Sequence, residues 1–472
     1  MSRERILIVR LPCRKVFPTG PVYLMSLLSR ASPHLALKLL DLALVEHRRR
    51  GEALEDAIRQ HSPDLLAFSW RDMQIFSPQD VDGGLRDAFI FFHDPSHARR
   101  IGAAFRGLRD MISYSSAMGE NLRLIRTAAR AHPDLEIALG GPSVKIFGDR
   151  LSDSLPRRVK LFPEQGLDRF FQSIGLSLPD HPEEPGVDLS AVERSFPQWP
   201  AYRGEAIGVQ TKQGCPHSCL YCLYGYLEGR RVVRRNPARV VQEIGSYARL
   251  WGARRFWFAD AQLLSEHADH AHLARILEGL EHEKLPIQWG GYLRIHEVDH
   301  ALGRLMVRSG LTDLEVSLNS GAQEVVDELR LGFSVDQAMK GFRVLKESGY
   351  AGKVLVNLSL NAPGETRQTL RRTLERVEEI KGIFGPDRVM PVVFFLAIQP
   401  HTGLETRALE DGHLGKGYDP LSVLPWNVLR LIYNPPPLGD IIGRSCARAF
   451  AAGGGSDLIL DMIAREIAAG PA

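Results

Sequence analysis

Residues 214–222 read GCPHSCLYC and place Cys215, Cys219 and Cys222 at CxxxCxxC spacing. The chain has 5 cysteines in 472 residues, so this one stretch holds most of them. In a reducing compartment, clustered thiols hold a metal more often than they form disulfides. Three thiolates are one short of the four that usually hold a cubane [4Fe-4S] cluster, so one iron would stay open to another ligand. The stretch therefore predicts a metal centre with an open coordination position.

A zinc site completed by His217 is the alternative for this stretch. Its four ligands would be crowded into the short CPHSC turn, whereas tetrahedral zinc needs them on all sides. We therefore favour a cluster over zinc.

The composition is that of a globular protein with two or three cores. Hydrophobic residues make up 44% of the chain and charged residues 24%. The formal charge of +3 is too small for a dedicated nucleic-acid binder. The start, MSRERILIVRLP, lacks the apolar core of a signal peptide, and no stretch is apolar enough to span a bilayer. We expect a cytoplasmic protein without membrane or nucleic-acid partners.

Two runs of arginine interrupt this even charge distribution. The run at residues 48–50 is typical of a solvated face. The other run consists of Arg230, Arg231, Arg234 and Arg235. It follows the cysteines closely, so an anionic cofactor or substrate is a candidate ligand there.

The first 175 residues alternate short apolar runs with helical patterns. Strand-like runs occupy residues 5–10, 35–42, 63–69 and 135–139. This alternation predicts a parallel, doubly wound sheet whose ligands bind beyond the carboxyl ends of its strands. The loops after residues 10, 69 and 139 should then face one crevice. The long aromatic segment at residues 74–116 is either a lid or a helical excursion that packs on the sheet.

The rest of the chain predicts a second α/β domain. Proline-rich residues 176–204 separate residues 1–175 from residues 205–410 as a linker. Six strand-like runs follow, at residues 207–210, 256–258, 287–289, 314–318, 354–360 and 392–398. This spacing predicts a partial (β/α)6 barrel of the TIM type, with the cysteines in the loop after its first strand. Residues 411–472 should form a short, mainly helical region that closes the barrel mouth on the substrate side.

The cysteine stretch and its companions resemble the radical S-adenosylmethionine (SAM) superfamily. The similarity covers about residues 205–405 and includes GGYLR at residues 290–294, SLNSG at 317–321, PGET at 363–366 and PHTG at 400–403. The resemblance implies that the three cysteines hold a [4Fe-4S] cluster whose open iron is chelated by SAM. It also implies a set of SAM contacts, namely Tyr221, Tyr224, Gln262, Arg294, Ser317, Asn319 and Pro363.

Several of these contacts have ordinary structural alternatives. Asn319 and Ser320 stand at the end of the strand that contains Ser317, where such residues form turns. Pro363 precedes a helix, and Arg294 is equally suited to a surface ion pair. After the second strand, Asp260, Gln262 and Glu266 stand where the family contacts the methionyl amine, but the GGE form is missing.

The N-terminal domain resembles that of the cobalamin-dependent subgroup. The similarity includes LIV at residues 7–9, PVYL at 21–24, PDLLAFS at 63–69, GGP at 140–142 and EQG at 164–166. It implies a Rossmann-like cobalamin-binding domain whose contacts are Pro12, Ser69, Trp70, Arg71, Gly140, Gly141, Pro142 and Glu164. A Rossmann-like domain without a corrinoid is the alternative.

The loop SWRD at residues 69–72 would then lie near the lower face of cobalt. The sequence has no DxHxxG motif, which matches a subgroup that often holds cobalamin without a protein histidine. Trp70 or Arg71 would block or face the metal. Alternatively, the loop starts a helix in which Asp72 is the cap and Trp70 packs.

The two resemblances together imply a cobalamin-dependent radical SAM methyltransferase. Its catalytic residues would be Cys215, Cys219, Cys222 and Arg71. It would transfer methyl from SAM through methylcobalamin to a carbon of a small-molecule or peptide natural product, by a radical or a polar route. The aromatic loops suit an indole-like or tryptophan-like substrate. A flavodoxin or ferredoxin would supply electrons.

Three other functions fit parts of the sequence. A cobalamin-dependent cyclase or ring-contracting oxidoreductase would share both cofactors without methylating. A corrinoid- or SAM-binding sensor would not need all three cysteines. A tRNA methylthiotransferase needs three further cysteines near its N-terminus, where this sequence has Cys13 alone, and normally ends in a small β-barrel.

Overall fold

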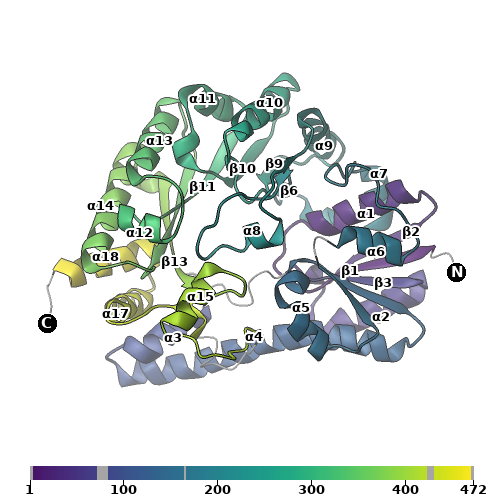
Figure 1. Cartoon of the computed structure of the whole chain (residues 1–472), viewed down its shortest axis with the longest axis horizontal. Coiled ribbons are helices and arrows are strands. Elements are labelled where there is room, and N and C mark those ends of the chain that lie inside the picture. Colours follow the sequence, from purple (N-terminus) through teal and green to yellow (C-terminus); the bar gives the residue numbers. More distant parts are fainter. Residues whose placement is uncertain (1–3, 72–82, 164–165, 422–429, 469–472) are drawn as a thin grey trace.

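The computed structural model describes residues 4–71, 83–163, 166–421 and 430–468 and contains two main β-sheets. Figure 1 shows the first sheet beside the N-terminus and the second beside the C-terminal helices. The expected α/β architecture, a Rossmann-like domain followed by a partial barrel and C-terminal helices, is confirmed. Within the described ranges, no helix is long and apolar enough to cross a membrane.

The first sheet is parallel, with strand order β2-β1-β3-β4-β5. Its strands are β1 (Arg5–Arg10), β2 (Ala36–Asp41), β3 (Leu65–Ser69), β4 (Glu136–Gly140) and β5 (Val159–Phe162). The flanking elements are α1 (Thr19–Ala31), η1 (Leu42–Leu44), η2 (His47–Arg49), α2 (Arg50–His61), α5 (Pro142–Ser154) and α6 (Leu167–Ser173). Because the strand order reverses between β1 and β3, this order has a ligand-binding switch point at their carboxyl ends.

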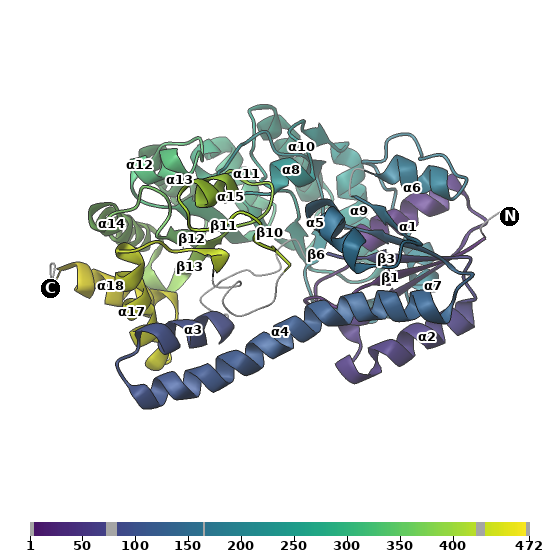
Figure 2. The ribbon, with the colours of Figure 1, turned by 60° about the horizontal axis from the view of Figure 1, so that its bottom comes forward.

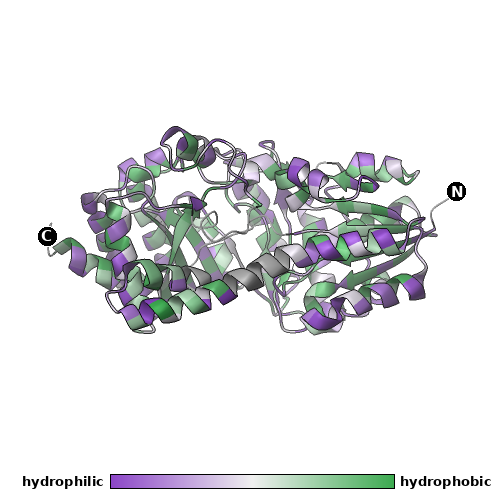
Figure 3. Cartoon of the chain, turned by 90° about the horizontal axis from the view of Figure 1, so that it is seen from below, coloured by the Kyte–Doolittle hydropathy of each residue, from purple (hydrophilic) through white to green (hydrophobic). Residues whose placement is uncertain are grey.

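A helical hairpin is inserted between β3 and β4. It consists of α3 (Gly83–His93) and α4 (His97–Ala131), the latter 35 residues long. Figures 2 and 3 show α4 running beneath both sheets. Its last turns pack on the first sheet, and the Phe89 ring of α3 lies 4.9 Å from that of Phe395 in the second. Of the two interpretations of the aromatic insertion, the described part shows a helical excursion, and one that reaches past its own sheet.

The second sheet has strand order β14-β13-β12-β11-β10-β9-β6. Its parallel strands are β6 (Ile207–Val209), β9 (Arg255–Phe258), β10 (Gln288–Tyr292), β11 (Leu311–Asn319), β12 (Lys353–Leu360) and β13 (Val389–Ala397). The short strand β14 (Ile432–Tyr433) pairs antiparallel with β13 at one edge. These strands overlap the six predicted runs, and β14 was not predicted.

Helices cover the outer face of this sheet. The covering helices are α9 (Pro237–Leu250), α10 (Ala268–His282), α11 (His300–Arg308), α13 (Val335–Glu347), α14 (Arg367–Phe384) and α18 (Ser456–Ala468). The other elements of this domain are η4 (Ile295–Glu297), α12 (Gln323–Glu328), η5 (Pro386–Arg388), α15 (Gly403–Glu410) and α17 (Leu438–Ala451), which packs on α3 and α18. The cysteine stretch is flanked by a two-stranded ribbon, β7 (Lys212–Gln213) and β8 (Val233–Arg234), and by α8 (Tyr224–Leu227).

The segment predicted as a linker packs against elements of both domains. It contains α7 (Leu189–Ser195) and η3 (Trp199–Tyr202). Trp199 stacks on Trp251 at 4.2 Å between ring centroids. Arg10 donates to the Tyr202 hydroxyl at 3.0 Å and to Asp41 at 2.8 Å, and all three side chains are buried. Apolar residues spaced along the segment thus bury it despite its prolines.

Candidate active site

A cavity of about 370 Å³ lies at the carboxyl ends of the second sheet. Its wall includes all three cysteines of the CxxxCxxC stretch. Six of the seven predicted SAM contacts also line it, namely Tyr221, Tyr224, Gln262, Arg294, Ser317 and Asn319. Pro363 does not line it, although it lies in the loop directly after β12. The fold therefore gathers the cysteine segment and residues at the carboxyl ends of β9, β10 and β11 into one space.

The cysteine loop is held in place by its own backbone. Gly214 has φ of +96°, and a Cβ atom there would lie 2.1 Å from the Arg231 carbonyl oxygen. Only glycine meets both conditions without strain. The Gly214 amide donates to Glu228 at 2.9 Å, and the Cys215 amide donates to the Gly229 carbonyl at 3.0 Å. The position of the first cysteine is therefore set by residues that follow the last one.

Burial makes all three thiols weak acids. It raises the pKa of Cys215, raises that of Cys219 to about 11 and raises that of Cys222 to about 12. The charges of Lys212 and Arg294 oppose the rise at Cys215. Thiolates in this pocket thus need a strongly positive centre to hold them, which an iron-sulfur cluster provides.

The described residues contain no group of three or more His, Cys, Asp or Glu side chains that is close enough to bind one metal ion. Thiolates of a cubane cluster bind different irons and so do not need to meet at one point. His217 of the zinc alternative has its Nε2 atom buried without a hydrogen-bond partner.

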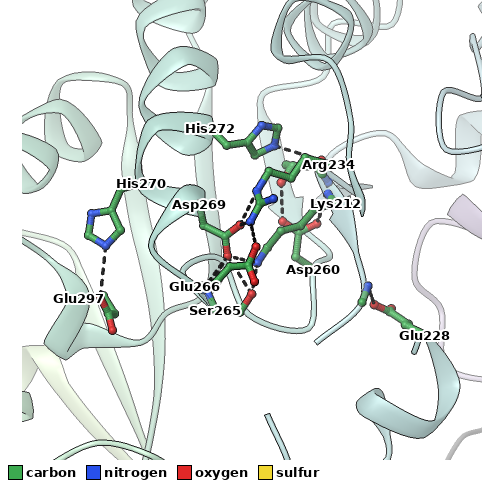
Figure 4. Close-up of polar contacts among 12 residues, drawn as sticks. Lys212, Glu228, Arg234, Asp260, Ser265, Glu266, Asp269, His270, His272 and Glu297 are labelled. Atoms are coloured by element: carbon green, nitrogen blue, oxygen red, sulfur yellow. Dashed lines mark hydrogen bonds and ion pairs between the residues drawn. The ribbon is translucent and has the colours of Figure 1, made fainter. Parts of the chain in front are cut away.

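A buried polar network fixes the base of the cysteine loop (Figure 4). The Asp260 carboxylate accepts from the amides of Thr211 and Lys212 at 2.7 and 3.1 Å. The Lys212 ammonium donates to Ser265 at 2.5 Å and forms a buried ion pair with Asp269. Sequence reasoning missed Lys212, although a lysine two residues after a strand and next to a cysteine motif was a usable signal.

This network distinguishes the three residues expected at the methionyl amine site. Of the three residues proposed to contact that amine, Asp260 is committed to the backbone of residues 211 and 212, and Glu266 is ion-paired with Arg234. Gln262 faces the cavity, and its Oε1 atom is buried without a hydrogen-bond partner. Gln262 is therefore the free polar acceptor at this strand end.

Tyr221 and Asn319 form a polar contact across the cavity. The Tyr221 hydroxyl donates to the Asn319 side-chain oxygen at 3.1 Å, and the Asn319 amide donates to the Ser317 carbonyl at 3.2 Å. Asn319 has φ of +60°, a conformation that asparagine tolerates better than most residues. Its turn-forming role and its place in the cavity wall therefore coexist.

Arg294 is not a surface ion-pair partner. Its guanidinium donates to the carbonyls of Leu331 and Gly332 at 3.0 and 2.9 Å and lies 5.9 Å from the Phe333 ring centroid. Burial lowers its pKa, and the nearby Cys215 and Cys219 oppose that effect. The described residues thus hold a cation beside the thiols through carbonyl groups rather than a carboxylate.

Glu315 is a further cavity residue that the sequence reasoning missed. It lies on β11 two residues before Ser317, so both face the same side of the strand. The Asn357 amide donates to the Glu315 carboxylate at 2.7 Å, and burial raises the pKa of Glu315. A charged residue at an inward strand position was the available signal.

The carboxyl edge of the first sheet is built mainly from backbone. Trp70 is buried in the core, so the packing alternative for its side chain is the one observed. Gly141 has φ of +105°, and a Cβ atom there would lie 2.4 Å from the Trp70 carbonyl oxygen. The Trp70 amide donates to the Gly140 carbonyl at 2.9 Å. Pro12, Ser69 and Pro142 are half-buried on the same edge, whereas Asp72 and Glu164 lie outside the described residues.

Arg71 connects this edge with the cavity. Its side chain is exposed, and it follows directly after the buried Trp70. Burial raises the pKa of Tyr224 and raises that of Tyr292 to about 12, and the Arg71 charge opposes both rises. The Arg71 charge therefore acts on two phenols of the cavity wall.

Contacts next to the cysteine loop hold the two domains together. The Lys145 ammonium donates to the Leu227 carbonyl at 2.7 Å, and the Tyr226 hydroxyl donates to the Lys145 carbonyl at 3.1 Å. The Tyr226 ring stacks on His401 at 4.3 Å, and a ring nitrogen of His401 lies 3.0 Å from the Ile146 carbonyl oxygen. The edge that carries Arg71 thus has a fixed position relative to the cysteines.

Residues 209–377 match the family profile of the radical SAM superfamily. This part of the chain is therefore a radical SAM domain. Among curated proteins, tRNA-2-methylthio-N(6)-dimethylallyladenosine synthase of Mycobacterium bovis is 25% identical over 286 residues, which are 55% of this chain and 53% of that protein. The Pelotomaculum thermopropionicum protein of the same name is 24% identical over 287 residues, 55% of this chain and 59% of that one. The chain thus spans little more than half of these relatives.

Solved structures share the fold over most of the chain. TsrM from Kitasatospora setae, a radical SAM methyltransferase solved with tryptophan and a SAM analogue, has TM-score 0.60 and 16% identity, covering 86% of this chain and 76% of that one. OxsB, a cobalamin-dependent radical SAM enzyme solved with aqua-cobalamin and SAM, has TM-score 0.53 and 13% identity, covering 91% and 57%. At these identities the likeness establishes the shared architecture.

Proposed function

We propose that this chain is a cobalamin-dependent radical SAM methyltransferase. It would move a methyl group from SAM through methylcobalamin to a carbon atom of a small-molecule or peptide substrate. The observation that carries the proposal is that the Rossmann-like domain is hydrogen-bonded to the segment that follows the three cysteines, through Lys145 of α5 with Leu227 and Tyr226. A corrinoid at the carboxyl edge of that domain's sheet and a cluster on the cysteine loop would therefore share one space.

The barrel side of the cavity fits a cluster with SAM. Cys215, Cys219 and Cys222 would hold the cluster, and the buried, unpaired Oε1 of Gln262 is an acceptor suited to the methionyl amine. Arg294 would remain beside the cluster as a fixed cation, because its donors already bind carbonyl oxygens. When bound, the cluster and SAM supply the electron and the methyl group, and the protein orients both and excludes water.

The first sheet fits a corrinoid at its switch point. Strand order β2-β1-β3-β4-β5 places that point at the carboxyl ends of β1 and β3, where Pro12 and Ser69 lie. Gly141 lets the loop after β4 pack directly against the Trp70 carbonyl beside this point. Arg71 would stand near the lower face of cobalt, where a guanidinium is a poor metal ligand because it stays protonated.

The substrate that fits best is aromatic and carries an N–H group. The cavity wall includes the rings of Tyr292, Phe333 and Phe394, which suit stacking against an indole. Glu315, held by Asn357, adds one acceptor to this wall. TsrM, which shares the fold, was solved with tryptophan. We therefore favour an indole-like or tryptophan-like acceptor.

The methylthiotransferase reading suggested by the curated relatives has less support. In this sequence only Cys13 and Cys446 remain outside the CxxxCxxC stretch. Cys13 is in the loop after β1, and Cys446 is buried in α17. A second three-cysteine cluster has no ligand set here.

The thiols that the first cluster requires place the proposed enzyme in a reducing compartment such as the cytoplasm.

The test is anaerobic reconstitution of the full chain with iron, sulfide and hydroxocobalamin. We expect one cluster and one corrinoid per chain, and transfer of label from methyl-deuterated SAM to tryptophan or a related indole. Arg71→Leu should retain the cluster and change the corrinoid absorbance spectrum. The control, Arg48→Leu on the same domain, should retain the cluster and leave that spectrum unchanged. A chain that binds the cluster and cleaves SAM but takes up no corrinoid would contradict the proposal.

A further inference from the structure

The arginine run after the cysteines is divided into two functionally different pairs. Arg234 points inward to Asp269 in Figure 4, and Arg235 is buried against Glu243. Arg230 and Arg231 are exposed, and neither forms an ion pair within the described part of the chain. Arg234 and Arg235 therefore serve the fold, whereas Arg230 and Arg231 leave two positive charges facing solvent.

The exposed pair lies against the cysteine loop. The ribbon pairs Lys212 with Arg234 and Gln213 with Val233, so the chain runs back along the approach to Cys215. The Gly229 carbonyl, one residue before Arg230, accepts from the Cys215 amide at 3.0 Å. Val233 is 36% exposed. We call Arg230, Arg231 and Val233 the basic ribbon, and its backbone touches the loop that holds the metal ligands.

The other flank of the cysteine loop has the opposite charge character. Leu220 donates its amide to Leu329 and accepts from Leu404, which fixes the loop between α12 and α15. The groove beside Leu220 is lined by four acidic residues against two basic ones, namely Glu324, Asp327, Glu328 and Glu410 against Arg330 and Arg407. A partner that approaches the loop from outside therefore meets positive charge on one flank and mainly negative charge on the other.

We propose that the basic ribbon is the docking surface for an acidic one-electron carrier of the flavodoxin or ferredoxin type. The inference rests on the proposed function, because it takes the three cysteines as cluster ligands. A flavodoxin hydroquinone would give up one electron and become the semiquinone, and the cluster would gain that electron and pass from the 2+ to the 1+ state. Complementary charge would steer the carrier to this flank and away from the acidic groove.

The direct test is binding of oxidised flavodoxin to the full chain in the double variant Arg230→Glu/Arg231→Glu. We expect the Kd at low salt to rise about tenfold or more, with a weaker dependence on salt concentration than in the wild type. The control is Arg254→Glu/Arg255→Glu, which makes the same charge change on two consecutive exposed arginines at the amino end of the barrel. This control should bind flavodoxin like the wild type.

Reduction of the cluster separates this inference from the proposed function. In the reconstituted protein, flavodoxin hydroquinone should reduce the cluster of the ribbon variant about tenfold more slowly, whereas dithionite should reduce both proteins equally. Arg230→Gln/Arg231→Gln should give an intermediate effect, which covers poor folding of the charge reversal. Three outcomes would overturn the docking surface. The wild type and the ribbon variant could bind flavodoxin equally well, or the control variant could lose as much flavodoxin affinity as the ribbon variant. The wild type could also fail to bind flavodoxin. A wild type that takes up no corrinoid would instead overturn the proposed function and leave the docking result standing.

Discussion

The carboxyl edges of the two sheets are built in different ways. On the barrel edge, side chains do the positioning: Asp260 holds two amides, and Lys212 is paired in the interior with Asp269. On the Rossmann-like edge, the backbone does it: Gly141 closes against the Trp70 carbonyl. A small ligand such as SAM is recognised by specific polar groups, whereas a large flat cofactor needs open space. We therefore expect the barrel edge to be disrupted by substitutions that change charge, and the Rossmann-like edge by substitutions that add side-chain volume.

The strongest test of this contrast is Cys215→Ala/Cys219→Ala/Cys222→Ala. We expect complete loss of iron-sulfur absorbance, of SAM cleavage and of methyl transfer, because no cluster ligand remains on the loop. Corrinoid uptake, measured by visible spectroscopy, should stay near the wild-type level. Loss of both cofactors together would show that the two edges are not independent.

The next test is Lys212→Met on the barrel edge. The change leaves Asp269 buried with Arg234 as its one charged partner, and we expect the free energy of unfolding to fall by about 3 kcal/mol. Denaturant unfolding measures this value. Lys160→Met removes an exposed pair with Glu136 on the other domain and should cost less than about 1 kcal/mol. Equal costs would remove the distinction between the buried and the exposed pair.

Gly141→Ala tests the Rossmann-like edge. The new Cβ atom would lie 2.4 Å from the Trp70 carbonyl oxygen at φ of +105°, so the loop before Arg71 must shift. We expect about 1–3 kcal/mol of destabilisation and weaker corrinoid uptake with the cluster intact. Gly148→Ala in α5 meets no atom within 4 Å and serves as the control. Unchanged corrinoid uptake in Gly141→Ala would contradict the backbone-built edge.

The smallest effect concerns a gap in the polar network of the barrel edge. Both carboxylate oxygens of Glu365 are buried without a hydrogen-bond partner, and burial raises its pKa from 4.5 to about 8. The folded state therefore holds the proton more tightly than the unfolded state does, and this contribution to stability is lost as pH rises from about 4.5 through about 8.

We therefore expect Glu365→Gln to gain stability relative to the wild type between pH 6 and pH 9, by on the order of 1 kcal/mol. Thermal unfolding at the two pH values measures the gain. Glu324→Gln is the control, because an exposed ion pair with Arg372 lowers the pKa of Glu324 and places its titration below this window. A gain that is the same at both pH values would contradict a titrating Glu365.

The sequence predicted the sheets well because their signal is local. Residues 63–69 were predicted as a strand, and β3 occupies residues 65–69 of that run, since PDLLAFS is an apolar run opened by a turn signal. The strand β5 was missed because VKLF is short and contains a lysine. Helix α4 was not foreseen at its length, because its sequence has no strong apolar stripe to mark one continuous helix.

The sequence motifs predicted where the candidate site lies, but they did not predict which residues each side chain contacts. The CxxxCxxC stretch identified the loop, and the strand ends identified the rest of the cavity. The sequence did not distinguish Asp260, Gln262 and Glu266, because their roles depend on Thr211, Lys212 and Arg234, which are distant in the chain. Trp70 and Arg71 are neighbours with opposite surroundings for the same reason: burial of one and exposure of the other depend on tertiary packing.

Helix α4 acts as a strut with a mechanical consequence. Its 35 residues correspond to roughly 50 Å of continuous helix beneath both sheets. Because a continuous helix resists bending, we expect the distance between the two sheets to stay constant on the side where α4 lies. We therefore expect relative motion of the two domains to take the form of a rotation about α4.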